Sequence, residues 1–265
     1  MHSNAQLAFK FIKYYLSASN GKGHGIHSPF VYDFIRKVLN KTNAPENAAQ
    51  IEARRKSLES NNSVIEVLDR GAGSRQAEFK QRSISGIAKS ALKQKKISQL
   101  LYRMGVHFNP DNILEMGTCF GITSSYLAMS MPNQTMVTME GAPAIAKEAQ
   151  ATFDLVHLKN IQIIEGDFST SLPEYLNTIP QIGMVYIDGN HRYAPTMEYF
   201  KLLLSKVNEH SVLIFDDIYW SSEMEKAWDD IKKQAEVTLT IDLFHVGIVF
   251  FRKENKQKQH FTIRY

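Results

Sequence analysis

Two short segments in the second half of the sequence combine acidic residues with a histidine. Asp188 and His191 are three positions apart, and Asp216 is followed directly by Asp217. Each segment follows an apolar run, at residues 184–187 and 212–215. Neighbouring carboxylates repel one another unless a cation neutralises them, and hard oxygen ligands suit Mg²⁺, Ca²⁺ or Mn²⁺. The three aspartates are therefore candidate ligands of a divalent cation, and His191 is a candidate general base.

Each of these residues also has a plainer interpretation. Asp188 could contact a substrate without any metal, and His191 could be a helix-cap or surface residue. Asp216 and Asp217 could instead cap a helix expected over residues 221–234. The sequence alone leaves these alternatives open.

A glycine-containing loop forms a second candidate site. The apolar run 112–116 contains Glu115 and leads through Gly117 and Gly121 into a helix expected from residue 122. Glycine lets the backbone approach a ligand closely, and a helix N-terminus offers free N–H groups. Glu140 ends the next apolar run, where a carboxylate can accept from both hydroxyls of a ribose.

This pattern alone is weak, because nicotinamide- and flavin-binding folds use similar loops. Here the spacing is Gly-x-x-x-Gly, which lacks the third glycine of the dinucleotide fingerprint. The acid before the first glycine would repel a pyrophosphate, whereas it complements a ligand with positive charge. The loop therefore favours a cationic nucleoside ligand.

Seven apolar runs must position these residues. Strands are expected at residues 112–116, 136–140, 161–164, 184–187, 212–215, 238–244 and 246–251, with helical segments between the first five. Such alternation predicts a parallel sheet with helices on both faces, and right-handed crossovers make it doubly wound. The last two runs are too close for a helix between them, so we expect an antiparallel pair at the sheet edge. The fold class is α/β, with a Rossmann-like seven-stranded sheet whose last strand is antiparallel.

The first hundred residues are mainly helical in pattern. An aromatic-rich stripe begins at Leu7, a second helix begins at Pro29, and a basic amphipathic helix over residues 84–104 is broken in its middle. The polar stretch 40–82 is expected to be partly mobile. Residues 69–75 also form a glycine loop after an apolar run. No second strand ending in an acid follows about 20 residues on, so we reject it as the nucleotide loop. It is either a lid or substrate-binding loop that holds an anion through Arg70 and Arg75, or a plain flexible loop, which is the favoured interpretation.

Residues 112–251 resemble the class I S-adenosylmethionine (SAM)-dependent methyltransferases in the glycine motif, the ribose acid and the antiparallel strand pair. The resemblance implies a SAM site formed by Glu115, Gly117, Thr118, Gly121, Glu140, Gly141, Asp167 and Phe168. Asp167 would bond the adenine amine, with Phe168 beside the ring. The implied organisation is a SAM-binding methyltransferase domain over residues 105–265 and an N-terminal helical cap or substrate segment over residues 1–104.

The acidic segments are similar to those of metal-dependent O-methyltransferases that act on small molecules. By this resemblance Asp188, Asp216 and Asp217 would bind Mg²⁺, and His191 would remove the proton of the acceptor hydroxyl. The catechol-type relatives have Asp-Asn where this sequence has Asp216-Asp217, so the match to that subgroup is imperfect. The acceptor is expected to be a small molecule.

Composition limits the remaining choices. The net charge of +4 permits an anionic partner without requiring one, and the single cysteine, Cys119, cannot form an intrachain disulfide. We expect a cytoplasmic protein without a membrane partner. The aromatic stripe near Phe9 and Tyr15 is more typical of a core or homodimer contact. Nucleic acid stays open as a partner, because the basic helix could meet phosphates. Competing functions are RNA or protein methylation, a nicotinamide-dependent oxidoreductase, and SAM binding without catalysis.

Overall fold

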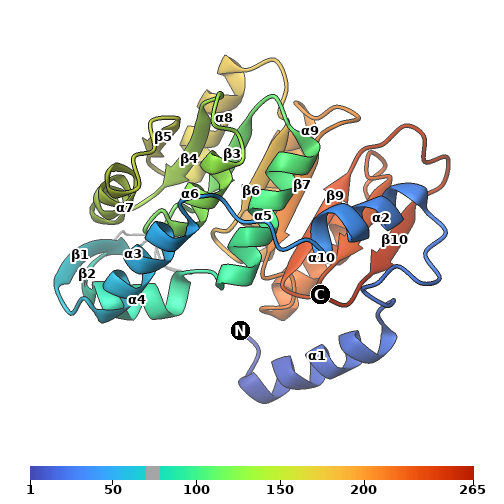
Figure 1. Cartoon of the computed structure of the whole chain (residues 1–265), viewed down its shortest axis with the longest axis horizontal. Helices are drawn as coiled ribbons and strands as arrows, with labels where there is room; N and C mark the ends of the chain where they lie inside the picture. The colour runs from blue at the N-terminus through green and yellow to red at the C-terminus, as the bar shows by residue number, and fades with distance from the viewer. Residues whose placement is uncertain (70–77) are drawn as a thin grey trace. The chain divides into compact units, whose positions relative to one another are not determined.

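The computed structural model describes residues 1–69 and 78–265 (Figure 1). The chain forms two compact units. The first unit comprises Met1–Lys41 and Leu172–Tyr265, and the second comprises Thr42–Ser171. The loop proposed from sequence to hold an anion, with Arg70 and Arg75, lies outside the described residues.

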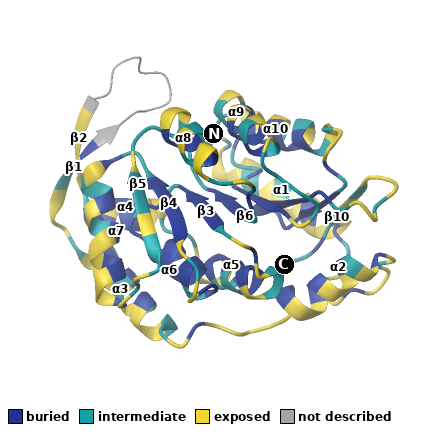
Figure 2. Cartoon of the chain, turned by 90° about the horizontal axis from the view of Figure 1, so that it is seen from above, coloured by how far each residue is buried: buried dark blue, intermediate teal, exposed yellow. Residues whose placement is uncertain are grey.

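The second unit contains three parallel strands in the order β3-β4-β5. They are β3 (Ile113–Met116), β4 (Met136–Glu140) and β5 (Ile161–Glu165). Every residue of β3 is buried, and so are the first four of β4, as the dark blue strands of Figure 2 show. The helix α6 (Ile122–Met129) follows β3, and α7 (Pro143–Leu155) packs on β4 and β5. The apolar runs of β3 and β4 thus form buried parallel strands, as expected for a sheet covered by helices, whereas β5 at the end of the strand order is only partly buried.

The first unit contains five strands in the order β10-β8-β9-β7-β6. They are β6 (Met184–Ile187), β7 (Val212–Asp216), β8 (Leu239–Asp242), β9 (Val246–Phe250) and β10 (Gln259–Thr262). The helices α9 (Tyr193–Leu204) and α10 (Ser222–Lys233) pack against each other, and α8 (Phe168–Thr178) precedes β6. Strand β9 runs antiparallel to both β7 and β8, whereas β10 runs parallel to β8.

The predicted fold class is confirmed, with one correction. The main sheet has eight strands in place of the seven expected. The additional strand is β10, whose residues Gln259, His260 and Thr262 give it no apolar alternation. It pairs with β8, so the β8–β9 pair is not at the sheet edge. A polar strand of four residues is specified by its neighbour, because the pattern of its own side chains does not distinguish it from a loop.

The chain begins with α1 (Asn4–Ser17), whose first turn is closed by a capping box between Ser3 and Gln6. The predicted second helix is α2 (Pro29–Phe34), which continues as the π-helix η1 (Ile35–Leu39). Ser28 caps α2, with Pro29 in its first turn as expected. The first unit therefore contains both N-terminal helices.

The aromatic stripe of α1 is not a core contact, which corrects that interpretation. Phe9 is 69% exposed and Leu16 is 74% exposed. The buried residue of the helix is Tyr14, whose hydroxyl donates to the carbonyl of Ile263 and whose ring packs on Phe244. One side of α1 is anchored in this way, and its apolar side faces solvent. The alternative interpretation, a homodimer contact, stays a prediction.

The N-terminal part of the second unit is more ordered than its polar sequence suggests. It holds α3 (Ala48–Ser60), an antiparallel hairpin of β1 (Val64–Asp69) and β2 (Glu78–Ser83), then α4 (Ile84–Ala91) and α5 (Lys95–Phe108). The break predicted in the basic helix lies between α4 and α5. A shared core links α3, β1 and α4 to Phe120 and Ile122, at the glycine loop and the start of α6. These elements therefore support that loop. The functional division at residue 104 stays a prediction.

None of the helices in the described part of the chain combines the length and the apolar character needed to span a bilayer.

Gly247 on β9 lies against the ring of the buried Trp228. A Cβ at this position would be 2.7 Å from two ring carbons. Gly247→Ala should therefore lower the free energy of unfolding by about 1–3 kcal/mol, the usual cost of overpacking. Chemical denaturation followed by tryptophan fluorescence measures this loss. Gly141→Ala is the control, because its Cβ would meet only the carbonyl oxygen of Gly166 at 3.7 Å. Equal stability of both variants and the parent would contradict the prediction.

Candidate active site

The loop between β3 and α6 requires glycine for two separate reasons. Gly117 and Gly121 have φ values of 107° and 75°, which side chains rarely adopt. A Cβ on Gly121 would also lie 2.5 Å from the ring of Phe153. The loop folds back on β4, because the N–H groups of Gly117 and Thr118 donate to the carbonyl of Met139. The predicted motif thus forms a tight turn at the carboxyl end of β3.

Glu115 is fully buried below this loop. Its Oε2 accepts from the hydroxyls of Ser124 on α6 and Thr138 on β4. Thr118 and Thr138 are also joined, with 2.6 Å between their hydroxyl oxygens. A hydroxyl has one proton, and that of Thr138 goes to Glu115, so Thr118 donates to Thr138. These hydroxyls fix the loop to β3 and β4 and stabilise a carboxylate in a buried position.

The carboxylate of Glu140 holds the loops around it. Its two oxygens accept from the N–H groups of Cys119 at 3.0 Å and Ala142 at 2.9 Å. Cys119 is left-handed, with a φ of 47°. The ribose acid inferred from sequence therefore lies beside the glycine loop, and in this structure it also orders two backbone segments.

Asp167 and Phe168 follow β5, next to the end of β4. The carbonyl of Glu140 accepts from the N–H of Gly166, which ties the two strand ends together. Asp167 accepts from both the N–H and the hydroxyl of Ser169, so it caps the start of α8, where Phe168 is the first residue. All residues predicted for the cofactor site lie in the second unit, at the carboxyl ends of β3, β4 and β5.

The acidic segments form a compact cluster in the first unit. Asp188, His191 and Asp216 each offer one ligand atom, and these atoms lie within 4.8 Å of one another. The Nε2 of His191 is 3.4 Å from the Oδ1 of Asp188, and Asp216 is 2% exposed. Two carboxylate oxygens can hold a divalent cation such as Mg²⁺ or Mn²⁺, and the imidazole nitrogen beside them can serve as a third ligand or as a base. Among the described residues this is the group that meets the geometry of a metal site.

The structure does not bring the neighbouring Asp217 into this group. Asp217 has a φ of 52°, and its N–H donates to the carbonyl of His245. The alternative that the aspartate pair caps α10 is wrong, because the side chain of Ser221 accepts from Met224 at that position. The helix-cap alternative for His191 is also wrong, because Arg192 is the N-cap residue of α9.

Tyr186 on β6 is a residue of this cluster that the sequence did not reveal. Its hydroxyl donates to Oδ1 of Asp216 at 2.9 Å and lies 3.4 Å from Oδ2 of Asp188. Burial raises the pKa of Tyr186 well above its usual value, and the carboxylates of Asp188 and Asp216 add to this shift. The tyrosine therefore stays protonated and acts as a donor. An apolar strand of four residues gives no sign of this role.

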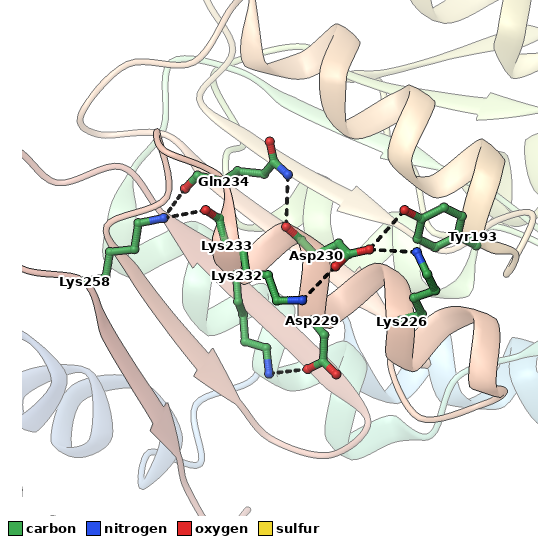
Figure 3. A network of polar contacts seen from close by, with 8 residues as sticks. All are labelled: Tyr193, Lys226, Asp229, Asp230, Lys232, Lys233, Gln234 and Lys258. Carbon is green, nitrogen blue, oxygen red and sulfur yellow. Dashed lines mark hydrogen bonds and ion pairs between the residues drawn. The ribbon is translucent and has the colours of Figure 1, made fainter.

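A surface network fixes the segment that follows His191. The hydroxyl of Tyr193 donates to Asp230 of α10 at 3.0 Å, and Lys226 pairs with the same carboxylate at 2.9 Å (Figure 3). Lys226 also lies 3.6 Å from the ring centroid of Tyr193, and the N–H of Tyr193 donates to Glu223 at 3.0 Å. The start of α9 is thus held on α10, which limits the movement of the loop 188–192.

Part of this chain is similar to a known domain. Residues 114–218 match a family model described as a methyltransferase domain. An uncharacterised protein of Acanthamoeba polyphaga mimivirus is 25% identical over 144 residues, which are 50% of this chain and 65% of the viral protein. This chain therefore matches less than two thirds of that relative's length.

The fold is shared with solved methyltransferases. A Podospora anserina methyltransferase with bound SAH superimposes with a TM-score of 0.60 at 12% identity, covering 96% of this chain and 98% of that one. A Bacillus cereus O-methyltransferase with SAH gives 0.55 at 14% identity, covering 83% and 97%. The O-methyltransferase TomG of Streptomyces achromogenes, solved with SAM, gives 0.53 at 17% identity, covering 61% and 82%.

Residues 114–218 thus match a methyltransferase domain, and the chain shares the fold of solved methyltransferases. Among these solved structures are O-methyltransferases, whose fold this chain shares.

The network around Asp230 predicts a dependence of stability on pH. Hydrogen bonds from Lys226, Lys233 and Tyr193 hold the pKa of Asp230 below its ordinary value of 3.8. A carboxyl with a lowered folded-state pKa stabilises the fold above its unfolded pKa, and this contribution is lost as pH falls. Asp230→Asn should therefore lower the Tm at pH 7, and the difference from the parent should shrink below about pH 4.

Thermal unfolding at pH 7 and pH 3 measures this difference. Asp229→Asn removes the same charge from the neighbouring position, where one ion pair with Lys232 is present. Its effect on Tm at pH 7 should be smaller. A larger effect of Asp230→Asn at pH 3 than at pH 7 would contradict the prediction.

Proposed function

We propose that this enzyme transfers the methyl group of SAM to a hydroxyl oxygen of a small molecule, with the assistance of a divalent cation. The observation that carries the proposal is the cluster of Asp188, His191 and Asp216 within 4.8 Å. Mg²⁺ is the simplest choice of cation, because hard carboxylate ligands suit it. Asp188 and Asp216 would hold the cation, and the third ligand expected from sequence, Asp217, stays a prediction.

SAM would bind at the loop between β3 and α6. Glu140 would accept from the ribose hydroxyls, and the negative charge of Glu115 would favour the cationic cofactor over a pyrophosphate. SAM would also lie against four residues of the neighbouring loops, Gly117, Thr118, Gly121 and Gly141. Asp167 and Phe168 would meet the adenine. The glycine φ values and the buried Glu115 support this assignment.

The reaction would be an in-line displacement. A bound cation would lower the pKa of the acceptor hydroxyl. His191, 26% exposed and beside Asp188, would take the proton of that hydroxyl at an imidazole nitrogen. The acceptor oxygen then forms a bond with the methyl carbon while the bond from carbon to sulfur breaks, so the sulfonium leaves as the neutral thioether of SAH. Positioning of the two reactants supplies much of the rate.

Two observations support a small molecule as the acceptor in preference to RNA. Arg103, in the helix considered for phosphate contact, is 6% exposed, which reduces the basic surface available to RNA. One solved neighbour is described as acting in tomaymycin synthesis, and another as a putative caffeoyl-CoA O-methyltransferase of Staphylococcus aureus. These descriptions belong to those proteins, and they support a small-molecule acceptor for this one.

The SAM site can be tested at Glu140. Glu140→Ala should weaken SAM binding by about 10–100-fold, because a charged hydrogen bond to the ribose contributes roughly 1.5–3 kcal/mol. Isothermal titration calorimetry measures the Kd. Glu165→Ala is the matched control, because Glu165 ends β5 in register with Glu140 but is exposed. If Glu140→Ala folds and binds SAM as tightly as the parent, the cofactor assignment is wrong.

The cation and the base can be tested by activity. Treatment with EDTA should abolish methyl transfer, and added Mg²⁺ should restore it. His191→Ala should lower kcat by about 10²–10⁴-fold, the usual contribution of a general base, while the Kd for SAM stays unchanged. His210→Ala, at an exposed position of the same unit, should leave both values unchanged. Full activity of metal-free enzyme across hydroxyl acceptors would exclude the cation.

A further inference from the structure

Tyr186 is a polar group in a strand that is otherwise apolar. Strand β6 has the sequence Met-Val-Tyr-Ile, and Tyr186 is fully buried in it. A phenylalanine could fill the same space, whereas a buried hydroxyl is unfavourable unless it makes a hydrogen bond. The hydroxyl therefore needs its two carboxylate neighbours, Asp216 and Asp188.

The distances show to which carboxylate the Tyr186 hydroxyl donates its hydrogen bond. Its single proton points best to Oδ1 of Asp216, at 2.9 Å, while Oδ2 of Asp188 is at 3.4 Å. Tyr186 and Asp216 lie on neighbouring parallel strands, with Tyr186 in register with Ile214. An aromatic ring has two side-chain torsions, so a packed tyrosine presents its hydroxyl at a fixed place. The Asp216 carboxylate is thereby prevented from rotating.

We propose that Tyr186 is a positioning residue of the cation site, whose hydroxyl fixes the Asp216 carboxylate in the orientation that a divalent cation requires. The inference rests on the proposed function, because it assigns Asp216 as a cation ligand. Asp216 and Asp188 approach each other closely, and their repulsion would turn the side chains apart. The hydroxyl proton donated to Asp216 reduces this repulsion, so the ligands keep their geometry before a cation arrives.

The alternative role of Tyr186 is structural. In that case the hydrogen bond only compensates for the burial of the hydroxyl, and removal of the hydroxyl changes the stability of the fold without changing its cation affinity. Partners that orient metal ligands typically contribute about 10–100-fold in affinity. Cation affinity therefore separates the two roles, and it does not depend on the acceptor or on SAM.

The test compares Tyr186→Phe with the parent in the full chain. Titration with Mn²⁺ followed by electron paramagnetic resonance, and with Mg²⁺ by calorimetry, gives the Kd. Tyr186→Phe should bind both ions about 10–100-fold more weakly. The matched control is Tyr126→Phe, because Tyr126 is also fully buried and donates to a carboxylate, Glu52, at 3.0 Å. The control should bind cations like the parent, and Tm values without cation should report the loss of each hydroxyl.

Each outcome decides one point. If Tyr186→Phe binds within about threefold of the parent, or more tightly, the positioning role is wrong although the cation site exists. If the parent binds neither ion, the cation site and the role of Tyr186 are both wrong. If the parent binds cations and Tyr186→Phe loses affinity, but methyl transfer proceeds in EDTA, the positioning role holds and the metal-assisted mechanism is wrong.

Discussion

Both parts of the candidate site depend on carboxylates that are buried at the ends of strands and stabilised there by hydroxyl donors. Glu115 accepts from Ser124 and Thr138, and Asp216 accepts from Tyr186. A carboxylate loses much of its hydration on burial, so these hydrogen bonds determine whether it keeps its place and its charge. The hydroxyls also come from other elements of the same unit, which connects each carboxylate to the surrounding fold.

The strand ends share a second feature, a left-handed backbone in residues other than glycine. Cys119 follows β3, Asn190 follows β6 and Asp217 follows β7, with φ values of 47°, 54° and 52°. Such residues occur where the surrounding structure enforces them, and they are common at functional sites. Here the sharp turns bring side chains back to the strand ends. The loop after β6 is followed by Tyr193 at the start of α9, which bonds to Glu223 and Asp230 of α10, so His191 lies beside an anchored residue.

Much of the candidate site could be predicted because it lies in short local motifs. The glycine loop, Glu140 and the aspartates each follow directly after an apolar run, and ligands of α/β sheets bind at the carboxyl ends of such strands. What the sequence missed depends on contacts between distant residues. In the sequence, Tyr186 looks like an ordinary strand residue, and only the fold brings its hydroxyl to 2.9 Å from Asp216. Likewise, the sequence does not show that Ser221, rather than Asp216 or Asp217, caps α10. Of the two interpretations of the α1 stripe, the core contact is wrong for Phe9 and Leu16, which are exposed, while Tyr14 and Phe11 pack on Phe244.

By itself the sequence determined the α/β class, the order of strands and helices from β3 to β9, and the identity of the polar residues at the strand ends. The hydrophobic period and the positions of glycines are local properties, so each helix, strand or loop can be predicted from its own residues. The tertiary structure decided the eighth strand, the exposure of α1, the place of Tyr186 in the acidic cluster, and the partners of Glu115 and Asp216. Each of these depends on which residues meet after folding, because burial and hydrogen bonding are set by neighbours that are far away in the chain.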